Sequence, residues 1–150
     1  MRDRRVAKII RACQELPGQD LLQYFDEDKA LRAVSSDDVN DYLRSIAGYG
    51  VTAKDFRTWA GTVLMARFLK EAGAFDTVKQ TKRALRAAIG RVAAAIGNTP
   101  AVCRKSYIHP AVISAYLDRK FVLEIATETA AGSASSLRPE EAATLALLRG

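Results

Sequence analysis

The sequence predicts a mainly α-helical protein with one small β-hairpin near its N-terminus. Three observations point to this fold class. Apolar residues recur at spacings of three and four through most of the chain, which is the period of a helix. Turn formers such as Pro17-Gly18 and Gly48-Tyr49-Gly50 separate these stretches. Two short apolar runs flank an acidic turn, which indicates the hairpin.

The N-terminal third is expected to hold a helix, the hairpin and a second helix. These elements are a helix over residues 4–16, strands over 21–25 and 31–34, and a helix that begins after Ser35 or Ser36 and ends before Gly48. The second helix begins with Asp37 and Asp38, which suit the positive end of a helix dipole. The apolar faces expected to point inward are Val6, Ile9, Ile10 and Cys13 on the first helix, and Val39, Tyr42, Leu43 and Ile46 on the second.

The rest of the chain is expected to form five helices. They run from about Thr52 to Glu71, from Thr77 to Ile96, from Pro100 toward Tyr107, from Pro110 through Phe121, and from Pro139 to about Leu148. The stripes expected to face inward on the two longest are Phe56, Trp59, Ala60, Val63, Leu64 and Phe68, and Val78, Leu85, Ile89, Val92 and Ile96. A stretch rich in Ala, Gly and Ser resembles a linker. We therefore divide the chain into residues 1–127, a linker over 128–137 and a C-terminal helix over 138–150.

Composition narrows the classes of function. The 150 residues and 49% hydrophobic content suit one soluble domain, and the longest apolar stretch is interrupted by Arg86 and Arg91, which argues against a membrane span. Two cysteines and one histidine exclude a disulfide framework and a zinc site built on two histidines. We expect no metal and no cofactor. The net charge of +6 suggests a polyanionic partner, most often nucleic acid.

Two segments stand out as carrying residues that could perform chemistry. They are Thr52-Ala53-Lys54-Asp55-Phe56-Arg57-Thr58-Trp59-Ala60-Gly61-Thr62 and Gly97-Asn98-Thr99-Pro100-Ala101-Val102-Cys103-Arg104-Lys105-Ser106-Tyr107-Ile108-His109-Pro110. Together they resemble the catalytic domain of type IB DNA topoisomerases, in the compact branch of bacteria and poxviruses, and the resemblance covers almost the whole chain. The layout is also similar to tyrosine recombinases, which share the fold. The resemblance implies nicking and resealing of one DNA strand without ATP, which relaxes supercoils.

The resemblance places the nucleophile on Tyr107, which would attack a phosphodiester and become joined to the 3′ phosphate. A free phenol has a pKa of about 10, so it needs positive neighbours at neutral pH. Arg104 and Lys105 lie beside it in the sequence, and Arg57 could arrive from the other motif. The alternative is that Tyr107 only packs its ring on the core. His109, the only histidine, is expected to cap or pack locally.

Further site residues follow from the same resemblance. Arg57 would grip two non-bridging phosphate oxygens, and Asn98 would donate a hydrogen bond to phosphate where many relatives have histidine. The alternatives are a surface ion pair for Arg57 and a helix N-cap for Asn98. Lys54, Arg104 and Lys105 are candidate contacts to DNA phosphates.

The resemblance is incomplete at the N-terminal end. The family's site also has a first arginine and a hairpin lysine, the general acid for the 5′ hydroxyl, and no residue here matches either role. A DNA-clamping domain is not matched either. We therefore expect the C-terminal part of a catalytic domain, severely impaired on its own. We also expect a monomer in the bacterial cytoplasm and nucleoid that binds double-stranded DNA.

Two other interpretations stay open. A tyrosine recombinase usually has histidine three residues before the motif's arginine, where this chain has Lys54. A non-enzymatic helical module could instead bind DNA through the basic face of residues 79–91. Salt-dependent DNA binding without a covalent adduct would favour the module.

Overall fold

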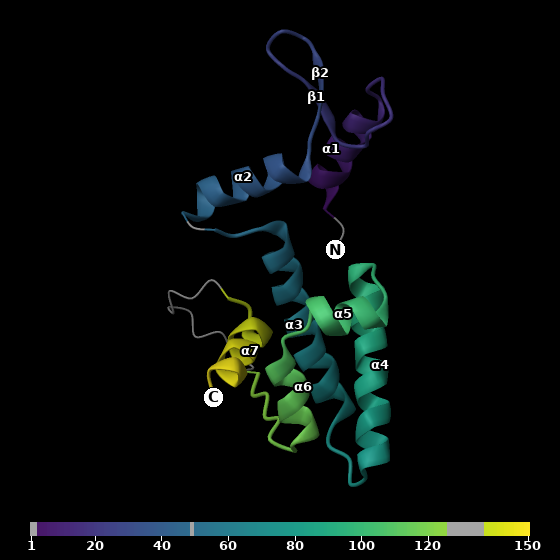
Figure 1. The fold of residues 1–150 in the computed structure, drawn as a ribbon, viewed down its shortest axis with the longest axis vertical. Coiled ribbons are helices and arrows are strands. Elements are labelled where there is room, and N and C mark those ends of the chain that lie inside the picture. Colours follow the sequence, from purple (N-terminus) through teal and green to yellow (C-terminus); the bar gives the residue numbers. More distant parts are fainter. Residues whose placement is uncertain (1–2, 49, 126–136) are drawn as a thin grey trace. The chain divides into compact units, whose positions relative to one another are not determined.

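The structure is a computed structural model that describes residues 3–48, 50–125 and 137–150. This part of the chain holds seven α-helices and one two-stranded sheet, which confirms the predicted fold class. The elements are α1 (Arg4–Gln14), β1 (Gln23–Phe25), β2 (Leu31–Ala33), α2 (Ser36–Ala47), α3 (Ala53–Ala72), α4 (Val78–Ile96), α5 (Pro100–Ser106), α6 (Pro110–Leu117) and α7 (Pro139–Arg149) (Figure 1). They fall into two compact units, Met1–Ala53 and Lys54–Gly150. Within the described residues, no helix has the length and apolar character needed to cross a membrane.

The hairpin of the first unit is shorter than predicted but lies where the sequence placed it. Its strands pair antiparallel, with Tyr24 opposite Arg32. The Asp26 carboxylate accepts a hydrogen bond from the Ala30 N–H at 2.8 Å and pairs with Arg32 at 2.8 Å. These contacts, with Arg32 the larger, lower the pKa of Asp26 below its usual value. The turn is therefore held by one side chain that contacts both of its ends.

The second helix of this unit, α2, begins and ends at the predicted signals. Ser35 accepts a hydrogen bond from the Asp38 N–H at 3.1 Å, and the Asp38 carboxylate accepts one from the Ser35 N–H at 2.8 Å. This reciprocal pair is a capping box. Gly48 ends the helix with φ of 73°, a left-handed conformation that glycine adopts without strain. Asn40 then accepts a hydrogen bond from the Ala53 N–H at 3.0 Å, which links α2 to the start of α3.

The apolar faces predicted for α1 and α2 are not buried inside the first unit. Ile9 is 61% exposed, Tyr42 65% and Ile46 62%. Among the described residues of this unit only Gln23 is buried. Two short helices and a hairpin are too few to enclose a core. The predicted inward orientation is therefore wrong for the exposed residues, while three others of the same faces are half-buried: Ile10, Cys13 and Leu43.

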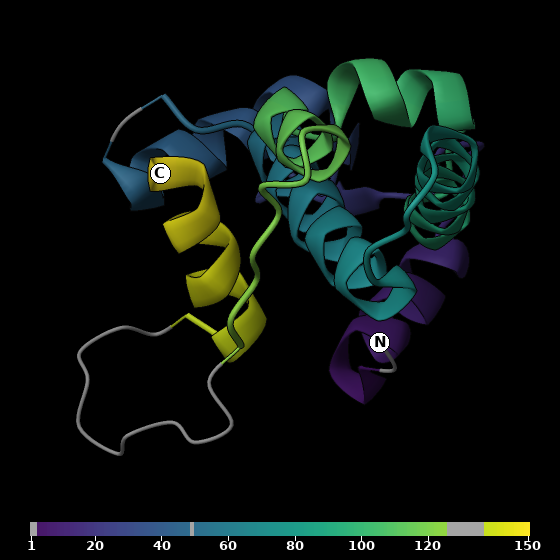
Figure 2. The same cartoon turned by 90° about the horizontal axis from the view of Figure 1, so that it is seen from below.

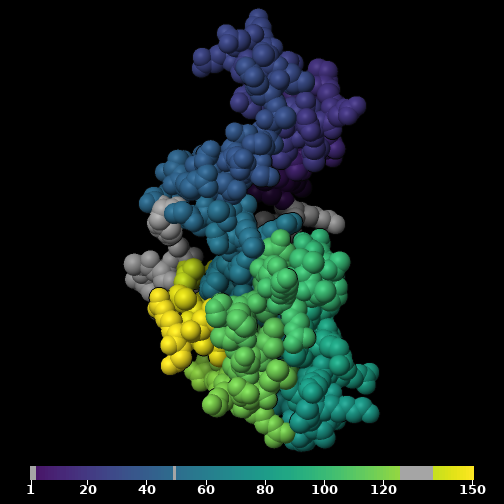
Figure 3. Space-filling view, in the orientation of Figure 1, coloured from purple at the N-terminus to yellow at the C-terminus, as the bar shows by residue number. Residues whose placement is uncertain are grey.

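The core of the molecule lies in the second unit. Figure 1 and Figure 2 both show α3 in the middle of this unit, with α4 and α7 on opposite sides of it. Met65 and Leu69 of α3, Val92 of α4 and Val112 of α6 are completely buried. In Figure 3, α5 and α6, drawn in green, cover much of α3. The C-terminal half of α3 is consequently enclosed on several sides.

Four predictions about side chains or boundaries of these helices are wrong. Ala60, which was predicted to face inward on α3, is exposed. Phe56 is 55% exposed and Val78 is 65% exposed, because both lie in the first turn of a helix, where few neighbours cover them. The helix α6 ends before Phe121 because Arg119 adopts a left-handed φ of 59°. Phe121 instead packs edge-on against Tyr116, with ring centroids 5.8 Å apart.

The helix starts predicted from threonine and proline are confirmed. Thr77 caps α4 by accepting a hydrogen bond from the Gln80 N–H at 3.3 Å. Pro100, Pro110 and Pro139 each begin a helix, where a residue without an N–H loses no intrahelical bond. Nearly all of the predicted linker over 128–137 falls in residues 126–136, outside the described residues, so the predicted division of the chain stays a prediction.

Candidate functional site

Tyr107 lies where the chain leaves α5. Its backbone N–H donates to the Cys103 carbonyl at 2.9 Å, which closes the last turn of the helix. Its side chain is half-buried and packs on the edge of the hydrophobic core. Among the described residues, no group hydrogen-bonds to its phenolic oxygen. The ring is therefore anchored while the hydroxyl stays available, so the packing role and a chemical role are compatible.

Arg57 reaches the same place from α3. Its guanidinium carbon lies 5.9 Å from the centroid of the Tyr107 ring, a cation–π distance. The rest of the arginine side chain is exposed. The structure thus brings together the two residues that the sequence motifs marked as nucleophile and phosphate ligand.

At Gly61 the backbone of α3 lies close to the backbone of Tyr107, which allows Arg57 and Tyr107 to lie side by side. Gly61 is buried in α3, one helical turn after Arg57. A Cβ added at Gly61 would collide with the Tyr107 carbonyl oxygen and would lie 3.3 Å from the carbonyl carbon. Only a residue without a side chain lets α3 and the Tyr107 peptide pack this closely. Sequence reasoning did not single out Gly61, since its requirement comes from a distant segment.

Two threonines on the same side of α3 hold the segment around the tyrosine. The Thr58 hydroxyl lies 2.9 Å from the Lys54 carbonyl oxygen and 3.3 Å from the Ser106 carbonyl oxygen, so its single proton is shared between these two acceptors. The Thr62 hydroxyl accepts a hydrogen bond from the His109 N–H at 3.1 Å. The contacts with Ser106 and His109 join residues far apart in sequence. Ser106 comes directly before Tyr107, and His109 lies two positions after it. His109 itself caps α6, since its Nδ1 accepts a hydrogen bond from the Ala111 N–H at 3.2 Å, as the sequence predicted.

Asn98 lies in the turn between α4 and α5. Its N–H donates to the Ala93 carbonyl at 2.9 Å, and its side-chain oxygen accepts a hydrogen bond from the Thr99 N–H at 3.0 Å. The N-cap of α5 is Thr99, whose hydroxyl accepts from the Val102 N–H at 3.3 Å. The N-cap alternative for Asn98 is therefore wrong. Within the described residues, Asn98 makes no hydrogen bond with Arg57 or Tyr107.

The other candidate cations lie on the two helices that meet at Tyr107. Lys54 is exposed in the first turn of α3, one turn before Thr58. Arg104 and Lys105 are exposed in the last turn of α5, where cations suit the negative end of the helix dipole. Tyr107 therefore directly follows the helix that carries two of these charges, and Arg57 shares α3 with the third.

The C-terminal helix also contacts α3, at Trp59, which sequence reasoning missed. Glu141 of α7 accepts hydrogen bonds from the Arg138 guanidinium at 2.8 Å and from the Arg138 N–H at 2.9 Å. The Arg138 hydrogen bond is the main cause that lowers the pKa of Glu141, and a hydrogen bond from Trp59 adds to it. The Arg138-x-x-Glu141 spacing signals the local pair. No pattern in the sequence signals the contact with Trp59.

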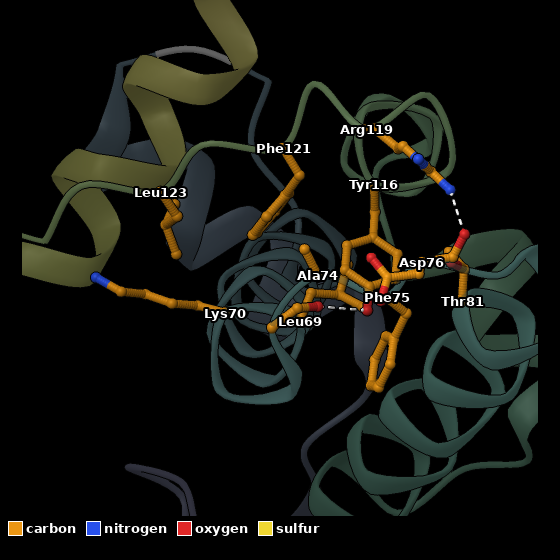
Figure 4. Close-up of a pocket in the computed structure, with 11 residues that line it drawn as sticks. Leu69, Lys70, Ala74, Phe75, Asp76, Thr81, Tyr116, Arg119, Phe121 and Leu123 are labelled. Carbon is orange, nitrogen blue, oxygen red and sulfur yellow. Dashed lines mark hydrogen bonds between the residues drawn. The ribbon is translucent and has the colours of Figure 1, made fainter.

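A separate cavity of about 300 Å³ lies near the C-terminal end of α3 (Figure 4). Two of the polar side chains that line it are engaged: the Tyr116 hydroxyl donates to the Gly73 carbonyl at 2.8 Å, and Arg119 donates to the Asp76 carbonyl at 2.6 Å. None of the candidate residues lines it. In residues 3–48, 50–125 and 137–150, no cluster of three or more His, Cys, Asp or Glu side chains is placed to hold a metal ion.

Comparison with known proteins agrees with the two motifs. A family model described as eukaryotic DNA topoisomerase I, catalytic core, matches residues 2–131. The matched region contains Arg57, Asn98 and Tyr107. It supports the type IB catalytic region that the sequence predicted, but not the compact bacterial and poxvirus branch. No curated protein matches the chain.

Proposed function

Because the chain belongs to the family of the eukaryotic DNA topoisomerase I catalytic core, we propose that it nicks and reseals one strand of duplex DNA through Tyr107. The observation that carries the proposal is the pair formed by Arg57 and Tyr107, with a guanidinium 5.9 Å from the ring centroid of a tyrosine whose hydroxyl is unengaged among the described residues. A nucleophile beside a fixed cation is the arrangement that phosphoryl transfer to a phenol requires.

The proposed reaction is a transesterification. The Tyr107 oxygen forms a bond with phosphorus, and the bond between phosphorus and the 5′ oxygen breaks. The electron pair of that bond leaves with the 5′ oxygen, which takes up a proton, while the phenolic proton passes to water. The phosphodiester is conserved as a phosphotyrosine, so the reverse attack by the 5′ hydroxyl reseals the strand without ATP.

Arg57 is the proposed ligand of the phosphate. Its guanidinium offers two parallel N–H donors, which match two non-bridging oxygens. Negative charge builds on these oxygens as phosphorus becomes five-coordinate, so a fixed donor stabilises the transition state more than the ground state. Removing such a donor typically slows a reaction by about 10²–10³-fold.

Asn98 and the exposed cations have supporting roles in the proposal. The Asn98 side-chain oxygen already accepts a hydrogen bond from Thr99, which leaves its NH₂ group as the part that can donate to a phosphate oxygen. Lys54, Arg104 and Lys105 would contact flanking phosphates. Such contacts position the duplex but carry no base specificity.

Covalent capture tests this function. The chain is incubated with a duplex nicked close to the cleavage position, so that the cleaved end diffuses away and the adduct accumulates. A denaturing gel should then show a protein–DNA adduct that forms slowly, because no residue here matches the family's general-acid lysine, and peptide mapping should place the DNA on Tyr107. The reaction is run with a chelator and without nucleotide. An adduct on another residue, or one that requires magnesium or ATP, contradicts the proposal.

A non-enzymatic DNA-binding module remains the second candidate, and one observation favours it. Lys79, Lys82, Arg83 and Arg86 are all exposed and follow helical spacing on α4. A stripe of this kind binds phosphates without chemistry. DNA binding that weakens with salt, with no adduct under any of the conditions above, would select this candidate over the enzyme.

A further inference from the structure

We propose that Gly61 and Thr62 are positioning residues for Tyr107. They fix the backbone of residues 107–109 against α3 and so set where the phenol stands relative to Arg57. This inference rests on the proposed function. It concerns residues that touch neither DNA nor the reacting atoms and act only through the nucleophile's own peptide.

The first support is the fit of Gly61 against the carbonyl of Tyr107. The nearest atoms to an added Cβ are the Tyr107 carbonyl oxygen, its carbonyl carbon at 3.3 Å and its Cβ at 3.4 Å. All three belong to the nucleophile itself, and two are backbone atoms that no rotamer change can move away. Any side chain at Gly61 would therefore push Tyr107 outward from α3.

The second support is a chain of hydrogen bonds through Thr62. The Thr62 hydroxyl donates to the Thr58 carbonyl at 2.7 Å, so its proton is committed within α3. Its oxygen can then only accept, and it accepts from the His109 N–H at 3.1 Å. Thr62 is 1% exposed, so water cannot easily take over this bond. Removing the hydroxyl would leave a backbone donor next to the nucleophile unpaired.

These two contacts hold the two ends of one short segment, residues 107–109, against α3. Gly61 meets the peptide that follows Tyr107, and Thr62 holds the N–H two residues later. Arg57 projects from α3 one turn before Gly61. The distance from the guanidinium to the phenol is therefore set by how closely this segment sits on α3. An error of about 1 Å in such a placement can cost about 10²-fold in rate.

The test uses a substrate on which this chain can be expected to form the covalent adduct at a measurable rate. A DNA duplex with sulfur in place of the bridging 5′ oxygen is cleaved by the same attack of the Tyr107 oxygen on phosphorus. The phosphorus–sulfur bond breaks, and the 5′ thiolate leaves with the electron pair. A thiol has a pKa near 8.5, so this leaving group needs no proton from a general acid. The rate of adduct formation is measured at saturating DNA, and DNA affinity is measured separately.

Gly61→Ala should slow adduct formation by about 10²-fold with little change in DNA affinity. The matched control is Gly90→Ala, because Gly90 also lies inside a helix and nothing within 4 Å would meet its added Cβ. Gly90→Ala should react at the rate of the unmodified chain. Equal slowing in both variants would overturn the role of Gly61.

Thr62→Val should slow adduct formation by tenfold or more, whereas Thr62→Ser should restore it because serine keeps the hydroxyl. The matched control is Thr144→Val. Thr144 is also fully buried and donates to the carbonyl four residues earlier, at 2.7 Å, but among the described residues it receives no hydrogen bond from another segment. A slow Thr62→Ser variant, or equal slowing in Thr144→Val, would overturn the role of Thr62.

The outcomes separate this inference from the proposed function. If the unmodified chain forms no adduct on the sulfur substrate, or if Tyr107→Phe still forms one, the proposed function fails. If the adduct forms on Tyr107 and the Gly61 and Thr62 variants react at the normal rate, only the positioning role fails. Circular dichroism identifies any variant that does not fold, and the Thr62→Ser and Thr62→Val comparison then decides the question.

Discussion

The guanidinium of Arg57 lies over the ring of Tyr107, with its carbon 5.9 Å from the ring centroid. The two residues come from α3 and from the end of α5. Without DNA, the guanidinium contacts the tyrosine ring. Breaking this contact costs little free energy, because an exposed cation–π pair contributes only about 0.5–1 kcal/mol. A phosphate that arrives beside Tyr107 would therefore compete for the guanidinium on favourable terms.

Tyr107→Phe should abolish the covalent adduct and leave DNA affinity nearly unchanged. The substitution removes the attacking oxygen but keeps the ring that packs on the core. The measurement is a denaturing gel for the adduct, with a fluorescence titration for binding. An adduct that persists in this variant would show that another residue is the nucleophile.

Arg57→Ala should slow adduct formation by about 10²–10³-fold at saturating DNA. Arg57→Lys should recover only part of the rate, because lysine keeps the charge but lacks the planar fork that matches two phosphate oxygens. Lys79→Ala, an exposed cation in the first turn of α4, serves as the control and should react normally. A normal rate in Arg57→Ala would remove Arg57 from the proposed site.

The sulfur substrate should react far faster than ordinary DNA in this chain. The resemblance assigns the general acid to a lysine that no residue here matches, and a positioned general acid contributes about 10²–10⁴-fold. The ratio of the two single-turnover rates measures this deficit directly. Similar rates on both substrates would mean that the chain supplies its own acid, and the expectation of impaired activity would be wrong.

Leu69→Ala should destabilise the chain by about 2–5 kcal/mol, because Leu69 is completely buried. Val78→Ala should change the free energy of unfolding by less than about 0.5 kcal/mol, because Val78 is 65% exposed. Urea denaturation followed by circular dichroism measures both. Comparable losses in the two variants would contradict the described burial.

Glu141→Gln should lower the melting temperature at pH 7, and the deficit should shrink in acid. The Arg138 hydrogen bond lowers the pKa of Glu141 in the folded state, below the ordinary value of 4.5. A lowered pKa stabilises the fold above the ordinary pKa, and this stabilisation is lost as the pH falls through the folded value. Melting curves at pH 7 and pH 3 therefore test the contact.

Glu140→Gln is the control for this pH dependence, because Glu140 lies beside Glu141 in the first turn of α7 but accepts neither Arg138 hydrogen bond. Its melting temperature should change less at pH 7. A deficit in Glu141→Gln that is as large at pH 3 as at pH 7 would show that the carboxylate charge is not what stabilises this end of the helix.

Much of the secondary structure was predictable because its signals are local. Ser35 with Asp38, Thr77, and the prolines at positions 100, 110 and 139 each satisfy or replace backbone groups at a helix end, within one turn of themselves. The two motifs that carry Arg57 and Tyr107 could likewise be read from residue type and spacing, and so could the capping role of His109.

Burial was less predictable because it depends on neighbours that the sequence does not name. A helical stripe marks which residues share a face, but Phe56 and Val78 lie at helix ends where few neighbours cover them. Met65 and Leu69 fall outside the predicted stripe of α3 and are completely buried, because α3 is enclosed on several sides. The same limit applies to the apolar faces of α1 and α2.

By itself the sequence determined the mainly helical fold, the positions where the helices begin, the family, and the two segments that hold the candidate residues. Only the tertiary structure decided how those segments meet. Gly61 has no neighbour in sequence that requires a glycine, and Thr62 looks like any buried helical threonine. Their importance comes from the peptide of Tyr107, a distant part of the chain that lies against α3 only after the helices have packed.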